Sequence, residues 1–329
     1  VSTLGKIDIQ GRGAADFLDR AYINAWQKLE VGKCRYGIML RDDGTTSRLA
    51  DTRYLMTTTI AHAQDVMRHL EYYLQLVWPD LDVHIVSVTD EWAAIALAGP
   101  DSRRVLAKLT PDIDVGNDAF PFMGVRAGTV AGVPGRVFRI SFSGELAYEI
   151  NVPADHGESV WEAVMEAGAD FTITPYGTEA LGILRTEKGH VVTGEINGRT
   201  TAGDLGFGRM ISTRKDFVGR CSLAHPAMTD GARAELVGLV PADGRTAIPR
   251  GAQIVRDPDH PLPNPMVGEV TSACFSPNLG KPIALALVSG GRSREGEMLY
   301  AMAPIQDRTV KVVVTGPVFV DPEGARLRA

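Results

Sequence analysis

The residue pattern of this chain changes between residues 226 and 233, where helix-breaking and polar side chains gather. Downstream of that point the apolar runs are short and turn residues separate them, a spacing typical of a small β-barrel or sandwich. The change predicts a domain boundary, with a separate β domain over residues 231–329. The predicted strands are 236–239, 252–255, 267–272, 283–288, 298–302 and 309–314.

Upstream of the boundary, helical and strand patterns alternate along the chain. Residues 4–9 alternate like a strand, and the apolar residues of 14–21 then recur at helical spacing. The next predicted strand, 36–40, is closed by a turn at 41–44. Further strands are predicted at 54–60, 83–89 and 92–97, and further helices at 63–76, 158–169 and 178–188. Together these patterns predict an α+β fold for the first part of the chain.

The stretch from Arg139 to Pro153 holds the first candidate site. Two short strands with period-2 alternation flank a turn at Ser143-Gly144-Glu145, and Glu149 follows in the second strand. One carboxylate can accept two parallel N–H bonds, so an acid in this setting can clamp a flat ligand with an amino-amidine edge. The alternative is a solvated hairpin with two surface acids. The residues alone leave both interpretations open.

Composition excludes several function classes. At 329 residues the chain has room for two or three domains, and 44% hydrophobic with 22% charged residues is typical of a globular protein. A net charge of −6 without a basic stripe argues against nucleic-acid binding. The three cysteines, Cys34, Cys221 and Cys274, are widely spaced, which indicates neither a disulfide framework nor a metal site.

Those cysteines favour a reducing compartment, so a cytoplasmic location is expected. No run reaches the roughly 18 apolar residues of a membrane span. The first residues show neither a signal peptide nor an initiating Met, and they alternate like a strand. The sequence is therefore expected to be a soluble piece of a longer polypeptide that begins inside a domain.

Several motifs resemble one known family. They are Ser143-Gly144-Glu145 with Glu149-Ile150, the run from Gly177 to Gly189 that contains Leu184-Arg185-x-Glu187, and the run 275–286 that begins Phe-Ser-Pro-Asn-Leu-Gly-Lys. In this order they resemble the folate-binding aminomethyltransferase family, the T-protein of the glycine cleavage system and its relatives. The resemblance implies a T-protein-like three-domain cloverleaf around a central folate cavity, with a C-terminal small β-barrel domain. Residues 1–230 would be the folate-binding region, two intertwined α+β subdomains with their N-terminal part missing.

Within that family, residues 34–37 (Cys-Arg-Tyr-Gly) and 173–180 look most like the C-terminal half of the α subunits of heterotetrameric sarcosine oxidases. The resemblance implies that tetrahydrofolate bound here captures the one-carbon unit from flavin-dependent sarcosine demethylation as 5,10-methylenetetrahydrofolate. It implies FAD, FMN and NAD elsewhere in the complex, and as partners the β, γ and δ subunits and an N-terminal dinucleotide-binding domain of the same chain. Two alternatives stay open: a free-standing folate-dependent aminomethyl- or methyltransferase, and a non-catalytic folate-binding or scaffold module.

The resemblance also implies roles for individual residues. Glu149 is the first candidate for the pterin edge and Glu145 the second, while Tyr176 and Arg209 are candidates for contact with the folate rings. Arg209 stands where relatives usually carry Trp, but a guanidinium can still stack on a ring face. Arg185 can reach a ligand carboxylate bidentately, or it can form an ordinary salt bridge.

The family's catalytic aspartate lies in a segment where this chain departs from the pattern. Only one Asp-Asp-Gly, Asp42-Asp43-Gly44, remains where a turn and a second short strand are expected. If the gap follows Gly44, Asp42 and Asp43 form the turn and the catalytic aspartate is missing. If the gap precedes Asp42, these residues are the aspartate segment itself, so Asp42 and Asp43 are both kept as catalytic candidates.

Overall fold

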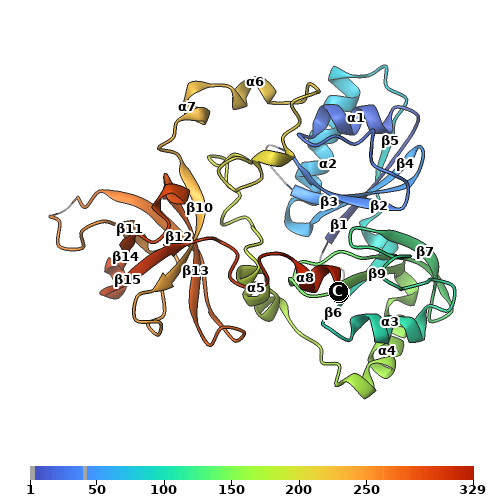
Figure 1. Ribbon diagram of the computed structural model, residues 1–329. Helices are drawn as coiled ribbons and strands as arrows, with labels where there is room; N and C mark the ends of the chain where they lie inside the picture. The colour runs from blue at the N-terminus through green and yellow to red at the C-terminus, as the bar shows by residue number, and fades with distance from the viewer. Residues whose placement is uncertain (1–3, 40–42, 262) are drawn as a thin grey trace.

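The computed structural model describes residues 4–39, 43–261 and 263–329, which form two sheets and a barrel (Figure 1). The first sheet has the strand order β2-β3-β4-β1-β5. Helices α1 and α2 bury apolar residues against one face of this sheet. Helix α2 continues as a π-helical turn at Tyr73–Val77. The elements are β1 Leu4–Gln10, α1 Ala14–Ala21, β2 Lys33–Ile38, β3 Asp43–Ala50, β4 Arg53–Thr59, α2 Ala63–Tyr72 and β5 His84–Ser87.

The second sheet has the order β6-β9-β8-β7 and is antiparallel throughout. Alternate residues of β6 and β9 face α3 and α4 and form one apolar core with them, as the period of two requires. The residues between them, Glu149 among them, point to the opposite face. The elements are β6 Trp92–Ala98, α3 Ser102–Leu109, β7 Val125–Val130, β8 Val133–Phe138, β9 Ala147–Pro153 and α4 Gly157–Ala167.

The remaining strands close into the barrel β10-β13-β12-β11-β14-β15. Closure leaves no free sheet edge, which settles the choice between barrel and sandwich. The barrel encloses its own apolar core. Its strands are β10 Ala234–Pro241, β11 Gln253–Val255, β12 Met266–Ser276, β13 Lys281–Ser289, β14 Met298–Ala303 and β15 Arg308–Thr315. The expected α+β class with a C-terminal barrel is therefore confirmed.

Short segments connect these three bodies. Helix α5, Thr178–Glu187, packs against β12, and the single turns α6, Arg220–Leu223, and α7, Pro226–Thr229, lead into the barrel. After β15 the chain returns to the second sheet, where Figure 1 shows α8, Ala325–Arg328, beside β9. No helix in the part of the chain that the structure describes is long and apolar enough to cross a membrane.

Two segments differ from the sequence prediction. The alternating residues 139–142, expected to be a strand before the turn, lie outside any strand, because β8 ends at Phe138 and β9 begins only at Ala147. Residues 41–44 were expected to be a turn, but Asp43 and Gly44 begin β3, which pairs with β2 from Ile38↔Asp43 to Lys33↔Arg48. This strand has no apolar alternation because both of its faces are covered and carry hydroxyls: Thr45 and Ser47 are buried on one face and Thr46 on the other. A pattern search that relies on apolar residues cannot detect such a strand.

Candidate functional site

Glu149 lies in the middle of β9, between Ala96 of β6 and Phe138 of β8. Both flanking residues are apolar, so neither neighbouring strand offers a donor or a charge to its carboxylate. The side chain is half-buried, and within the described residues no hydrogen bond or ion pair reaches it. Its oxygens are not among the fully buried atoms that lack a partner, so solvent still reaches the carboxylate. A half-buried carboxylate without a protein donor is nevertheless uncommon, because such groups are normally paired.

The electrostatic surroundings of Glu149 follow from this position. Burial raises the pKa of Glu149 to about 7, and the positive charge of Lys6 in β1 offsets part of that effect. Near neutral pH the group therefore exists in both protonation states. A ligand that donates N–H groups would favour the ionised form.

Tyr176 lies close enough to Glu149 to interact with it electrostatically. Burial raises the pKa of Tyr176, and the charge of Glu149 raises it further. Tyr176, 41% exposed, lines a cavity of about 340 Å³ together with Ala96, Trp161 and the loop at 171–177. Ala96 is the register partner of Glu149, but the carboxylate does not itself line this cavity, whose walls come mainly from α3, α4 and the 171–177 loop. Tyr176 thus lines the cavity and lies within electrostatic reach of Glu149.

The turn before β9 is firmly held. Gly144 has φ +82°, and a Cβ there would lie about 3.0 Å from the stem of Lys188, so a side chain would be strained on both counts. The Gly144 N–H donates to Ser141 Oγ at 3.2 Å, and the Tyr36 hydroxyl donates to the Ser141 carbonyl at 3.1 Å. The carboxylate of Glu145 accepts a hydrogen bond from Arg326 of α8. Of the two acids of the motif, the structure pairs Glu145 and leaves Glu149 without a partner.

Arg185 has an internal set of partners. Its guanidinium donates to Ser272 Oγ at 2.7 Å, to the His190 carbonyl at 3.2 Å and to Glu195 Oε2 at 3.4 Å. These contacts tie α5 to the barrel strand β12. The structure therefore favours the salt-bridge alternative for this residue over contact with a ligand carboxylate.

The other candidates are placed as follows. Arg209 is exposed on the single 3-10 turn Gly208–Met210. Asp42 lies outside the described residues, and of Asp43 the structure gives only the backbone, opposite Ile38 at the start of β3. The described residues contain no group of three or more His, Cys, Asp or Glu that could hold a metal ion.

Two residues of this region were missed by sequence reasoning. Lys6 of β1 is fully buried, although a lysine in a half-buried strand is expected at the surface. His190 stacks on Phe142 of the turn, with ring centroids 5.5 Å apart, and burial lowers the pKa of its imidazole. Lys6 lies on the face of β1 that an isolated sheet would expose, so no local signal marks its burial.

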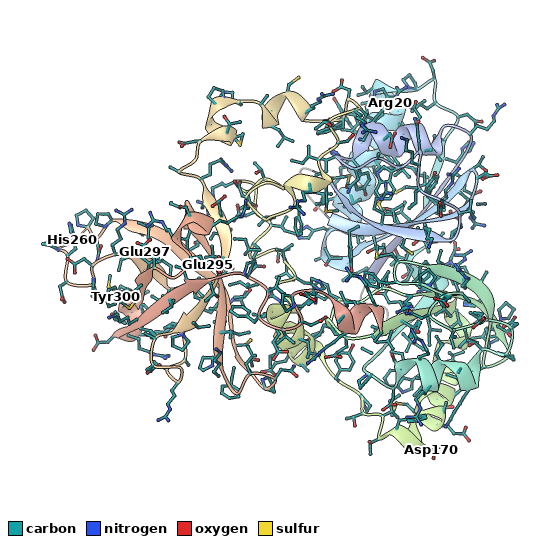
Figure 2. The ribbon with its side chains drawn as sticks, in the orientation of Figure 1. Arg20, Asp170, His260, Glu295, Glu297 and Tyr300 are labelled. Carbon is teal, nitrogen blue, oxygen red and sulfur yellow. The ribbon has the colours of Figure 1, made fainter. Side chains whose placement is uncertain are left out.

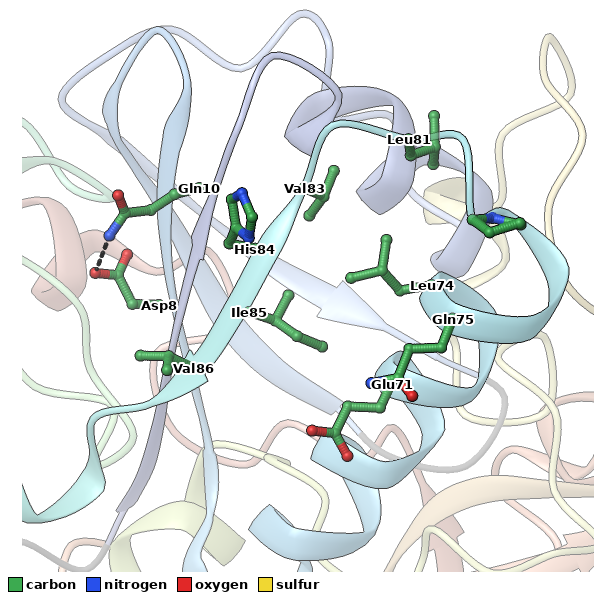
Figure 3. Close-up of a pocket in the computed structure, with 11 residues that line it drawn as sticks. Asp8, Gln10, Glu71, Leu74, Gln75, Leu81, Val83, His84, Ile85 and Val86 are labelled. Atoms are coloured by element: carbon green, nitrogen blue, oxygen red, sulfur yellow. Dashed lines mark hydrogen bonds between the residues drawn. The ribbon is translucent and has the colours of Figure 1, made fainter.

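Other acids and hollows lie away from this region. A surface groove of about 760 Å³ runs between β5, β1 and the end of α2 (Figure 3). Its buried acid, Asp8, already accepts from Arg53 Nη2 at 2.5 Å and from Gln10 Nε2 at 3.0 Å. Figure 2 shows Glu295 and Glu297 on the barrel, distant from the second sheet. Among these acids, Glu149 is the one that combines partial burial with a carboxylate that no described donor or cation contacts.

Comparison with known families matches both parts of the chain. Residues 1–215 match the family described as "GCVT N-terminal domain", and residues 235–321 match "Glycine cleavage T-protein C-terminal barrel domain". The aminomethyltransferase T of the glycine cleavage system from Bartonella henselae has a similar structure, with a TM-score of 0.83 and 23% identity over 98% of this chain and 85% of that one. That likeness shows the fold.

Curated relatives fall into two groups. Sarcosine oxidase subunit alpha of Rhizobium meliloti (strain 1021) is 48% identical over 99% of this chain but only 34% of its own length, and that of Corynebacterium sp. (strain P-1) is 46% identical with the same coverage. The chain thus spans about a third of the length of these relatives. The aminomethyltransferase of Streptomyces avermitilis is 34% identical over 90% of this chain and 79% of its own length.

Proposed function

Because this chain belongs to the glycine cleavage T-protein family of aminomethyltransferases, we propose that it is the tetrahydrofolate-binding part of a sarcosine oxidase α subunit. The observation that carries the proposal is the unpartnered carboxylate of Glu149, which interacts electrostatically with Tyr176 in the wall of a cavity. The pterin ring of folate presents an amino-amidine edge with two parallel N–H donors, the complement of one ionised carboxylate.

The residues of this chain would bind and shield the reacting atoms. Glu149 accepts the N–H pair of the pterin, and Tyr176 and Arg209 are the proposed contacts to the ring faces. When bound, tetrahydrofolate supplies N5 and N10, which take up formaldehyde with loss of water to give 5,10-methylenetetrahydrofolate. The cavity wall holds these atoms in place and excludes competing solvent, so effective concentration supplies much of the rate. Asp42 and Asp43 remain the proposed acid–base residues.

The one-carbon unit would come from elsewhere in the assembly. In this proposal a flavin oxidises the N-methyl group of sarcosine, and the domain described here captures the product. FAD, FMN and NAD would be held outside this segment, by a dinucleotide-binding domain of the same chain and by the β, γ and δ subunits. We also propose a division of this segment into residues 1–230, which bind folate, and 231–329, the barrel domain.

A second candidate is a free-standing folate-dependent aminomethyltransferase. The 34% identity to the Streptomyces avermitilis enzyme, over 79% of that enzyme, favours it. A non-catalytic folate-binding or scaffold module is the third possibility. Flavin absorbance of the purified full-length protein separates the first candidate from the other two, because only the first co-purifies with flavin subunits.

The direct test is calorimetric titration of the full-length protein with tetrahydrofolate in oxygen-free buffer. A charge-assisted bond contributes about 1.5 to 3 kcal/mol, so Glu149→Gln should weaken binding about ten- to hundredfold. Glu158→Gln, at an exposed acid of α4, is the matched control and should bind like wild type. Equal affinity of Glu149→Gln and wild type would remove Glu149 from the site, and no binding by wild type would overturn the proposed function.

A further inference from the structure

Lys6, in strand β1 of the first sheet, is a buried cation without an ion-pair partner among the described residues. Its side chain is 0% exposed. The ammonium group donates to the carbonyls of Leu4 at 3.2 Å and Thr89 at 3.4 Å. Within the described part of the chain no carboxylate lies within 4.0 Å of it. Lysine is seldom buried unless it is paired, so this position needs an explanation.

The position of Lys6 is fixed by the junction between the two sheets. Its backbone N–H donates to Thr89 Oγ1 at 3.1 Å, and its carbonyl accepts from the Val88 N–H at 2.9 Å. Three residues after Thr89 the chain enters β6, which pairs with β9 along its whole length. The buried ammonium is therefore anchored at the point where the first sheet leads into the sheet that carries Glu149.

Lys6 and Glu149 border the same layer between the two sheets. Lys6 pairs with Thr57 of β4, two residues from Leu55. Leu55 packs in one buried cluster with Phe138, the register partner of Glu149.

Each of these two residues, Lys6 and Glu149, is also the main opposite charge of the other. Burial lowers the pKa of Lys6, and among the negative charges that offset this effect Glu149 is larger than Asp90. For Glu149 the effect of burial is likewise opposed by Lys6. Cys34 of β2 and Tyr176 also interact electrostatically with Glu149. Burial raises the pKa of the Cys34 thiol to about 12, so it stays neutral, and burial also raises the pKa of Tyr176.

We propose that Lys6 is a positioning residue of the folate site, whose buried ammonium group keeps the Glu149 carboxylate ionised and free to accept the N–H groups of the ligand. This inference rests on the proposed function, because it concerns the same carboxylate. Lys6 is closed off from the cavity and does not touch the ligand. It acts through its charge, which is effective over several ångströms where water is excluded.

A buried charge in this position solves a specific problem of the site. A carboxylate that binds N–H donors must shed water, and desolvation alone favours its neutral form. A cation in hydrogen-bond contact would restore the charge but would occupy the oxygens that the ligand needs. A cation outside hydrogen-bond contact with the carboxylate supplies the field and leaves the oxygens free.

The test is the pH dependence of tetrahydrofolate binding by the full-length protein between pH 5.5 and 9. Wild-type affinity should fall as pH drops through about 7, the pKa of Glu149. Lys6→Met and Lys6→Gln should move this midpoint upward by about 0.5 to 1 pH unit. At a full unit, affinity at pH 7.5 falls about threefold, while at pH 9 it returns close to the wild-type value.

Three variants make the result specific. Lys6→Gln keeps a donor for the two carbonyls, so a shared shift in Lys6→Met and Lys6→Gln assigns the effect to charge. Lys6→Arg keeps the charge and should keep the wild-type midpoint. Lys108→Met removes one positive charge from the exposed Lys108–Asp170 pair of α3 and should also leave the midpoint unchanged.

The outcomes separate this inference from the proposed function. An equal loss of affinity at every pH in both neutral variants means a merely structural role for Lys6 and overturns the inference. If the midpoint of the pH dependence stays near 7 in Lys6→Met and Lys6→Gln but disappears in Glu149→Gln, the inference about Lys6 is overturned. Glu149 then remains in the proposed site. If tetrahydrofolate affinity is the same at every pH and equal in wild type and Glu149→Gln, the proposed function is overturned as well.

Discussion

Arg326 of α8 donates a hydrogen bond from its guanidinium to the carboxylate of Glu145, across 181 residues of sequence. The contact fastens the returning C-terminal segment to the turn that precedes β9. It also separates the two acids of the motif: Glu145 is committed to the protein, and four residues later Glu149 is not. The resemblance alone ranked these acids, whereas the structure gives them different surroundings.

Glu145→Gln should therefore leave folate affinity within about threefold of wild type. The Arg326–Glu145 pair is partly exposed, and such pairs contribute about 0 to 1 kcal/mol to stability. Arg326→Ala should give a similarly small loss in the free energy of unfolding, measured by urea denaturation. Tenfold or greater weakening of folate binding by Glu145→Gln would place Glu145 in contact with the ligand.

A second contact of the same segment is buried. Lys188 donates to Asp321 Oδ2 at 3.0 Å, and their side chains are 8% and 10% exposed. Removal of one partner leaves a buried charge, so Lys188→Met should lower the free energy of unfolding by about 3 kcal/mol. The double variant Lys188→Met/Asp321→Leu should recover part of that loss, because no unpaired charge remains. A double variant less stable than the single one would contradict this account.

The same pair predicts sensitivity to acid. Burial alone raises the pKa of Asp321, but hydrogen bonds from Lys188 and from the N–H groups of Ala325 and Arg326 outweigh it, so the net pKa is lowered. The stabilisation is present above the ordinary aspartate pKa and is lost as pH falls through the lower, folded value. Asp321→Asn should therefore be less stable than wild type at pH 7, and the difference should shrink towards pH 2.5. A constant difference in urea denaturation across this range would rule out the titration of Asp321 as its cause.

Arg185 offers a test of how the barrel is attached. Its partners Ser272 and Glu195 are buried with it. Arg185→Met would therefore leave the buried Glu195 carboxylate without a cation. A loss of about 3 kcal/mol in the free energy of unfolding is expected. Arg209→Met, at an exposed arginine, is the control and should change stability by no more than about 0.5 kcal/mol. Equal stability of the two variants would mean that the network does not hold the barrel.

Periodic residue patterns predicted most of the individual helices and strands of this fold. The strand and helix at the start, the strand that carries Glu149 and every strand of the barrel follow from periods of two and 3.6. The boundary between α5 and the loop that follows it was also marked, by Gly189 with φ +73°. These features depend on side chains within a few residues of each other, so a single sequence contains them.

What the sequence could not predict depends on distant partners. Strand β3 is stabilised by buried hydroxyls and not by apolar residues, and the internal role of Arg185 requires Ser272, 87 residues away. Lys6 is buried because the second sheet covers the face of β1 on which it lies. The alternation of apolar and polar residues in β1 predicts that this face is exposed to solvent. Such pairings exist only after the chain has folded, and for that reason the chemistry of the candidate site was less predictable than its location.

The raised pKa of Glu149 should be visible in stability without any ligand. Between the ordinary glutamate pKa of 4.5 and the folded value of about 7, the folded protein binds more protons at this site than the unfolded chain. Stability must therefore fall as pH rises through that window, by at most about 3 kcal/mol and by less to the extent that solvent reaches the half-buried group. Glu149→Gln cannot titrate, so its stability relative to wild type should increase from pH 5 to pH 8 in urea denaturation, whereas Glu158→Gln should follow wild type. A difference that is the same at both pH values would mean that Glu149 ionises normally and is already solvated. A rising difference would show that the folded protein keeps a destabilising carboxylate at the place where the proposed ligand would satisfy it.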